Sequence, residues 1–170
     1  MNVMLTSCGL ETKALEAQFK KMLKKTPEEA KAIFIPTAAT SAGAIEVLPK
    51  CMNDLLKCGI KGENIFVYDL YDNLTAEFLE QYDIIYLCGG SPEYLLRRIN
   101  QSGFGKHIHA FIERNGLVLG VKRGEYYLCR KPYGSSGSAS LCSGCTLRQK
   151  QLRKARKIRH ERKKANPIGK

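Results

Sequence analysis

Five short apolar runs, separated by segments with helical periodicity, are the feature that most restricts how this chain can fold. The runs span residues 2–7, 31–37, 64–70, 83–88 and 117–121. Between them, apolar side chains recur three and four residues apart, which predicts helices over residues 11–25, 41–59, 75–82, 92–99 and 104–114. Nearly continuous apolar strands that alternate with helices are typical of a parallel sheet covered on both faces. We therefore predict an α/β fold with three layers and a mostly parallel, doubly wound sheet.

The distribution of charge divides the chain after residue 121. The whole chain carries a formal net charge of +12, but residues 1–121 hold 13 Lys and Arg against 14 Asp and Glu. Residues 122–170 hold 15 Lys and Arg against 2 Asp and Glu. A Ser- and Gly-rich stretch precedes the most basic run, which is the composition of a linker followed by a charged tail. We predict an incomplete α/β domain over residues 1–121, an irregular linker over 122–147 and a basic tail over 148–170.

Length and hydropathy suggest one domain that is not inserted in a membrane. A chain of 170 residues can bury one substantial core. No apolar run approaches the ~20 residues that a membrane-spanning helix needs, and the chain does not begin with a basic and then apolar leader. We therefore expect a cytoplasmic protein.

The seven cysteines are expected to be reduced thiols in that compartment. Cys142 and Cys145 form a C-x-x-C pair, for which Cys129 and His160 are the nearby additional ligands. A structural zinc site normally combines two such pairs, and the chain has no second one. We expect no metal and no cofactor.

Three of the predicted strands end in residues suited to a binding site. Pro36-Thr37-Ala38 follows the second strand, Gly89-Gly90-Ser91 follows the fourth, and Gly120-Val121-Lys122-Arg123-Gly124 closes the fifth. The carboxyl ends of parallel strands meet at one edge of the sheet, where ligands of open α/β folds bind. The sequence therefore predicts a site at this edge.

Four segments in this region resemble a known family. They are MLTSCGL (4–10), FIPTA (34–38), IIYLCGGSPEYLLRRI (84–99) and NGLVLGV (115–121), and they occur in the family's order and spacing. The chain is similar over about residues 1–121 to the peptidase E and cyanophycinase family of serine peptidases. That resemblance implies a flavodoxin-like architecture shared with class I glutamine amidotransferases, here C-terminally truncated. It also implies hydrolysis of small peptides with an acidic residue at the cleaved bond.

The resemblance also implies roles for particular residues. In the family, a Ser in a G-x-S-A-G elbow attacks the substrate carbonyl, a His later in the chain is its base, and backbone N–H groups hold the oxyanion. Here Gly89 and Gly90 correspond to the oxyanion turn, and Gly120 and Gly124 to the elbow glycines. Ser91, at a position where the family often has Asn, and Thr37 are the residues we expect to contact substrate.

The position of the nucleophile is where the chain departs from the family. Lys122 occupies it, and Arg123 follows where the family has Ala. The later histidine, His160, lies in the basic run, whereas His107 and His109 precede the elbow in a predicted helix. We expect no peptidase activity from the chain as it stands.

Three explanations of Lys122 remain open. A lysine nucleophile would require its ammonium to be neutral, which a neighbouring cation such as Arg123 favours. A pseudoenzyme could instead have acquired a basic tail for interaction. The third explanation is a break in the reading frame. One set of codons compatible with residues 122–129, AAG-CGC-GGG-GAG-TAT-TAT-CTT-TGC, gives Ser-Ala-Gly-Ser-Ile-Ile-Phe when it is read one base later, which is the family elbow followed by an apolar segment.

A different class of function follows from the tail alone. Residues 148–170 contain eleven Lys and Arg, which would attract nucleic acid or another acidic surface with a strong dependence on salt. No aromatic residue follows Tyr133, so stacking on bases is not expected. The alternative function is therefore non-specific binding of RNA or DNA through residues 148–170.

Overall fold

The predicted strands form one parallel sheet in the computed structural model of the chain, which describes residues 2–71 and 74–121. The predicted linker and basic tail lie outside the described residues. The sheet has the order β1-β5-β4-β2-β3, and every pairing in it is parallel. Its strands are β1 (Val3–Thr6), β2 (Ala32–Ile35), β3 (Ile65–Val67), β4 (Ile84–Leu87) and β5 (Leu117–Val121). β5 thus lies inside the sheet, between β1 and β4.

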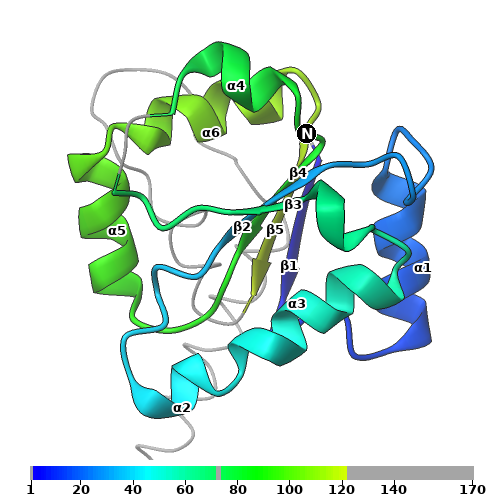
Figure 1. Ribbon diagram of the computed structural model, residues 1–170, viewed down its shortest axis with the longest axis horizontal. Helices are drawn as coiled ribbons and strands as arrows, with labels where there is room; N and C mark the ends of the chain where they lie inside the picture. Colours follow the sequence, from blue (N-terminus) through cyan, green and yellow to red (C-terminus); the bar gives the residue numbers. More distant parts are fainter. Residues whose placement is uncertain (1, 72–73, 122–170) are drawn as a thin grey trace, which may run out of the picture. The chain divides into compact units, whose positions relative to one another are not determined.

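The helices lie in two layers, one on each face of the sheet (Figure 1). They are α1 (Lys13–Met22), α2 (Ala42–Ile45), α3 (Leu48–Lys57), α4 (Ala76–Glu80), α5 (Pro92–Gln101) and α6 (Phe104–Glu113). Helices α1 and α3 pack in one core, and α4, α5 and α6 pack in the other. The connections that lead along the sheet toward β3 contain α1 and α3 and cover one face. The connections that lead back toward β1 contain α4, α5 and α6 and cover the other face, as expected when all crossovers have the same hand. The predicted three-layer α/β fold is confirmed.

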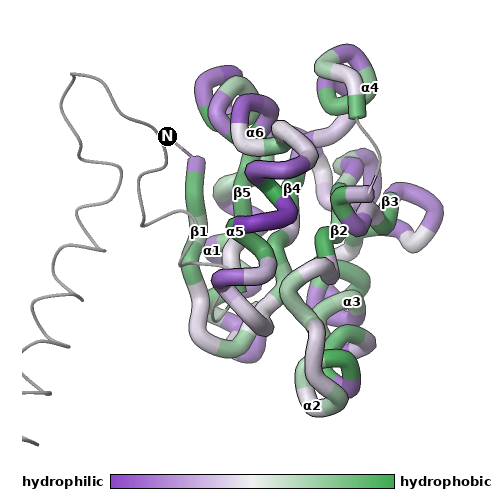
Figure 2. The backbone as a smooth tube through the Cα atoms, turned by 90° about the vertical axis from the view of Figure 1, so that its left-hand side faces the viewer, coloured by the Kyte–Doolittle hydropathy of each residue, from purple (hydrophilic) through white to green (hydrophobic). Residues whose placement is uncertain are grey.

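Alternation along the strands explains why they are apolar throughout. In β2, Phe34 faces the core under α1 and α3, and Ile33 and Ile35 face the core under α4 to α6. In β4, Tyr86 faces the core under α1 and α3, and Ile85 faces the core under α4 to α6. Figure 2 shows the mostly hydrophobic strands between helices that contain both hydrophilic and hydrophobic residues. Because both faces of β2, β4 and β5 are buried, these strands have no position that favours a polar residue.

Two predicted elements differ from the structure in a way that local chemistry explains. The single helix predicted over residues 41–59 is two helices, α2 and α3. Pro49 has no N–H to donate to the Ile45 carbonyl, and its ring would clash with that carbonyl in a continuous helix, so the chain restarts with Pro49 in the first turn of α3. The third strand is also shorter than predicted: it ends at Val67, and Leu70 adopts a left-handed conformation (φ 58°).

Within the described residues, none of the helices combines the length and the hydrophobicity needed to cross a membrane.

Candidate functional site

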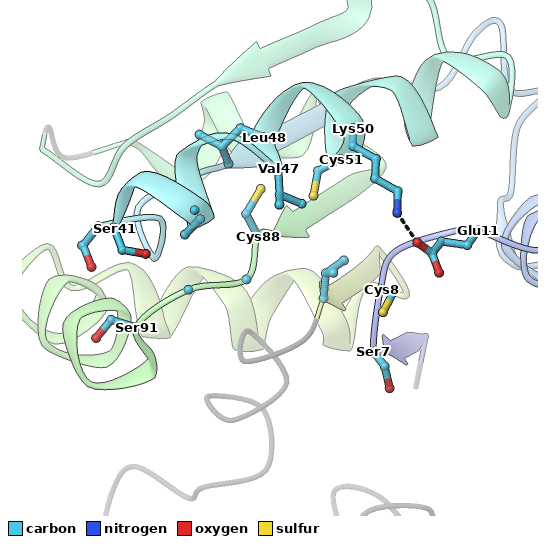
Figure 3. A pocket seen from close by; sticks show the side chains of 16 residues that line it. Ser7, Cys8, Glu11, Ser41, Val47, Leu48, Lys50, Cys51, Cys88 and Ser91 are labelled. Atoms are coloured by element: carbon cyan, nitrogen blue, oxygen red, sulfur yellow. Dashed lines mark hydrogen bonds and ion pairs between the residues drawn. The ribbon is translucent and has the colours of Figure 1, made fainter.

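A cavity of about 610 Å³ lies at the carboxyl edge of the sheet, where the sequence predicts a site (Figure 3). Residues that follow β1, β2 and β4 and the last residue of β5 line it, together with the start of α3. The neighbouring strands β4 and β2 lead to opposite faces of the sheet: the chain after β2 enters the α3 layer, and the chain after β4 enters the α5 layer. Such a switch point opens a crevice between neighbouring strand ends.

The double-glycine turn after β4 forms one wall of the cavity. Gly90 has a φ of 152°, and a Cβ there would overlap the Ala38 carbonyl and lie 2.8 Å from the Ala39 nitrogen. The turn is fixed on both sides, because the Cys88 N–H donates to the Ile35 carbonyl (3.0 Å) and the Ser91 N–H donates to the Ala38 carbonyl (2.7 Å). Only glycine fits between the two segments at position 90, so the second glycine of Gly89-Gly90 has a steric cause.

The turn also has backbone N–H groups in residues that border the cavity. Gly89 and Gly90 both line the cavity. Among residues 2–71 and 74–121, no hydrogen bond from either of their N–H groups is formed. Peptide N–H groups that converge on a cavity are suited to hold an oxyanion, since they cost no reorganisation when negative charge develops.

The turn after β1 forms the opposite wall and is held by a buried acid. Gly9 has a φ of 82°, and its N–H donates to Thr6 Oγ1 (3.1 Å). The next N–H, that of Leu10, donates to Oδ2 of Asp54 on α3 (2.9 Å). Asp54 is 6% exposed, so this hydrogen bond satisfies a carboxylate that burial would otherwise penalise. This hydrogen bond therefore fixes the position of α3 relative to the turn after β1.

An exposed ion pair joins the same two elements at the cavity. Lys50 Nζ of α3 donates to Glu11 Oε1, and both residues line the cavity (Figure 3). The hydrogen bond to Glu11 raises the pKa of Lys50 above its ordinary value. An ammonium at this place gives the cavity a positive group within reach of an anionic ligand.

The structure places the predicted substrate residues in different surroundings. Ser91 lines the cavity, but its hydroxyl accepts the Tyr94 N–H (3.3 Å) and so caps α5. Thr37 is buried, does not belong to the cavity lining, and its Oγ1 has no partner among the described residues. Ser91 is therefore better placed to orient α5 than to bind a ligand through its side chain.

Replacement of the cap tests this role of Ser91. We expect Ser91→Ala to lower the free energy of unfolding by about 1 kcal/mol, because the Tyr94 N–H loses its acceptor. Ser41 precedes α2 in the same cavity and makes no cap hydrogen bond, so Ser41→Ala is the matched control with an expected change near zero. Urea denaturation followed by circular dichroism measures both. Equal effects of the two substitutions would contradict the assigned cap.

The predicted elbow begins in the sheet and continues beyond the described residues. Gly120 pairs with Leu5 of β1 and Leu87 of β4, and Val121 lines the cavity. Lys122, Arg123 and Gly124 lie outside the described residues, as do Cys129, Cys142, Cys145 and His160. β5 thus carries the chain to the cavity at Val121, the residue before the predicted nucleophile.

Neither histidine in the described part of the chain lines the cavity. His107 is half-buried beside the Phe104 ring (6.0 Å between centroids), and His109 is exposed, both on α6. In the same residues, no group of three or more His, Cys, Asp or Glu side chains is arranged to hold a metal ion.

The sequence does not predict Glu11, Lys50 and Cys51 as cavity residues, nor the role of Asp54, which lies outside the lining and holds the turn after β1. One signal for them was present. Asp54 lies at the spacing i, i+4, i+7 with Val47 and Cys51, which makes it an acid on an otherwise apolar helix face. Such a residue indicates a specific buried partner, which here is the turn after β1.

The comparisons with known proteins agree with this geometry. The model of Peptidase family S51 matches residues 3–132, which includes both glycine turns and the predicted elbow. The search of curated proteins gave no match. Among solved structures, a "putative peptidase E protein" from Listeria monocytogenes EGD-e is 23% identical with a TM-score of 0.58. The match covers 72% of this chain and 59% of that chain, and at this identity it establishes a shared fold.

Proposed function

Because the chain belongs to peptidase family S51, we propose that its cavity is the peptide site of a serine-type hydrolase that lacks its nucleophile. The observation that carries the proposal is the meeting of the double-glycine turn and the end of β5 at one cavity. A tetrahedral intermediate needs donors to its oxyanion and a nucleophile about 3 Å away, and strand ends that converge on one cavity can supply both.

The roles of the described residues follow from their positions. The N–H groups of Gly89 and Gly90 hold the oxyanion, and the packing of Gly90 against Ala38 fixes the position of their turn beside the cavity. Lys50 attracts the carboxylate of a small acidic peptide once its pairing with Glu11 opens. Such a peptide fits a cavity of about 610 Å³.

The missing step is nucleophilic attack. A side chain at position 122 must lose a proton to a base, and a lysine ammonium has no electron pair to attack with until it is neutral. The described histidines, His107 and His109, lie away from the cavity lining and offer no base. We propose that Lys122 results from a break in the reading frame of a peptidase gene, with the family's base encoded in the other frame.

Turnover by the protein as it exists tests this function. We expect the purified 170-residue chain to release no product from aspartyl dipeptides above the buffer rate. Measurable turnover that is lost in Lys122→Met would overturn the proposal in favour of lysine chemistry.

The basic tail supports a second candidate function, the binding of RNA. Eleven Lys and Arg in residues 148–170 would make that binding strong at low salt and weak at high salt. We expect retention of the chain on single-stranded RNA to fall at least tenfold, on the order expected for several phosphate contacts, between 50 and 200 mM salt. Deletion of residues 148–170 should abolish it. Retention that survives the deletion would refute a role of the tail.

A further inference from the structure

Two buried thiols meet at the floor of the cavity and take no part in the proposed hydrolysis. Cys51 belongs to α3, and Cys88 directly follows β4. Both line the cavity, and their exposed fractions are 5% and 0%. Figure 3 shows the two sulfur atoms directed toward one another from opposite elements. The cavity therefore gives a small reagent access to a pair of cysteines that large molecules cannot reach.

We propose that Cys51 and Cys88 form a dithiol site that reacts with peroxides and closes to a disulfide at the floor of the cavity.

The surroundings of the pair make Cys51 the reactive member. A hydrogen bond from the Cys88 thiol lowers the pKa of Cys51 to about 7. Burial raises this pKa, and the Tyr86 hydroxyl lowers it. Tyr86 Oη is buried without a hydrogen-bond partner among the described residues, and its hydroxyl lowers the pKa of Cys51. Of the charged groups on α3, Lys50 lowers the pKa of Cys51 and Asp54 raises it.

The second thiol has the opposite character. Burial, followed by its contact with Cys51, raises the pKa of Cys88. Cys88 therefore keeps its proton while Cys51 ionises near neutral pH. A thiolate that can attack beside a thiol that can resolve is the arrangement that converts an oxidised cysteine into a disulfide.

The reaction balances with a peroxide as the oxidant. The Cys51 thiolate attacks one peroxide oxygen, the O–O bond breaks, and the leaving hydroxide takes a proton to become water. Cys51 is then a sulfenic acid. The Cys88 sulfur attacks the Cys51 sulfur, the S–S bond forms, the S–O bond breaks, and hydroxide leaves with the Cys88 proton as a second water. Two thiols have lost two electrons, and hydrogen peroxide has become two waters.

Peptide mapping of the full chain tests the pairing. Trypsin cleaves after Lys50, Lys57, Lys61 and Arg97, so Cys51, Cys58 and Cys88 fall in separate peptides, 51–57, 58–61 and 62–97. After exposure to hydrogen peroxide, alkylation of the remaining thiols and digestion, we expect peptide 51–57 linked to peptide 62–97. Linkage of either peptide to the one containing Cys8 or to a tail cysteine instead would overturn the proposal.

Alkylation rates of the reduced protein give an independent test. Cys58 is buried outside the cavity, and burial raises its pKa to about 11. At pH 7.5 we expect iodoacetamide to modify Cys51 at least about 100-fold faster than Cys58, since only the thiolate reacts. Equal rates would contradict the assigned reactivity.

Variants separate the pair from general oxidation. In Cys88→Ala, the sulfenic acid of Cys51 should persist and be trapped by dimedone, whereas the control Cys58→Ala should still form the linked peptide. Failure of wild-type protein to form the link under conditions that oxidise Cys8 would overturn the proposal, whatever the stability of the variants.

Discussion

Gly90→Ala should lower the free energy of unfolding by about 3 kcal/mol, because the added methyl group has no room and the backbone has no relaxed alternative. The φ of 152° is one that residues with a Cβ rarely adopt, and the Cβ would overlap the Ala38 carbonyl. That carbonyl accepts the Ser91 N–H, so the turn cannot move away without losing this hydrogen bond. A shift of this size should be visible as a large fall in the urea midpoint or in soluble yield.

Gly43→Ala is the control for this substitution. Gly43 also lines the cavity, but a Cβ there meets nothing within 4 Å, and it lies in a helix, where Ala is favoured over Gly by about 1 kcal/mol. We expect its urea midpoint to equal or exceed that of the wild type. If Gly90→Ala and Gly43→Ala unfold at the same urea concentration, the double-glycine turn does not pack on residues 38–39 as described.

Restoring the reading frame after Val121 should increase the turnover of aspartyl dipeptides by at least about 10⁴-fold, the usual effect of a nucleophile and its base together. The scaffold required for this gain is already in place, since the Gly89-Gly90 turn and the end of β5 line one cavity. The comparison uses the 170-residue chain and a chain that keeps residues 1–121 and continues one base later.

The double substitution Lys122→Ser with Arg123→Ala is the matched control. It recreates Ser-Ala-Gly with the existing Gly124 but leaves the rest of the chain unchanged. Because a serine without a base is a weak nucleophile, we expect it to remain at least about 10³-fold below the repaired chain. If the double substitution alone restores full turnover, a frame break after Val121 is not needed to explain the loss.

The inner strands β2, β4 and β5 could be predicted because they are covered on both faces. A run such as Ile84–Leu87 then has one interpretation, since no polar alternation competes with it. The break between α2 and α3 was missed because the apolar stripe from Ile45 to Leu56 continues across Pro49 and masks the clash that separates the helices.

The candidate site could be predicted only where it is made of backbone. Glycine turns at strand ends identify a binding edge from local sequence, and Gly89 and Gly90 lie at the cavity. The contributions of Glu11, Lys50 and Cys51 depend on how α3 lies over the end of β1, which is decided by the contact between Asp54 and Leu10, 44 residues apart in sequence. The local pattern indicates that Asp54 needs a buried partner, but it does not identify Leu10 as that partner.

The nucleotide sequence across codons 120–129 tests most directly whether this chain is an S51 hydrolase that lost its elbow at Lys122. We predict that a shift of one base after the codon of Val121 gives Ser-Ala-Gly and then an apolar segment, with an in-frame His downstream. A nucleotide sequence in which neither alternative frame encodes Ser-Ala-Gly would contradict the account, and Lys122 would then be a true replacement of the family's nucleophile.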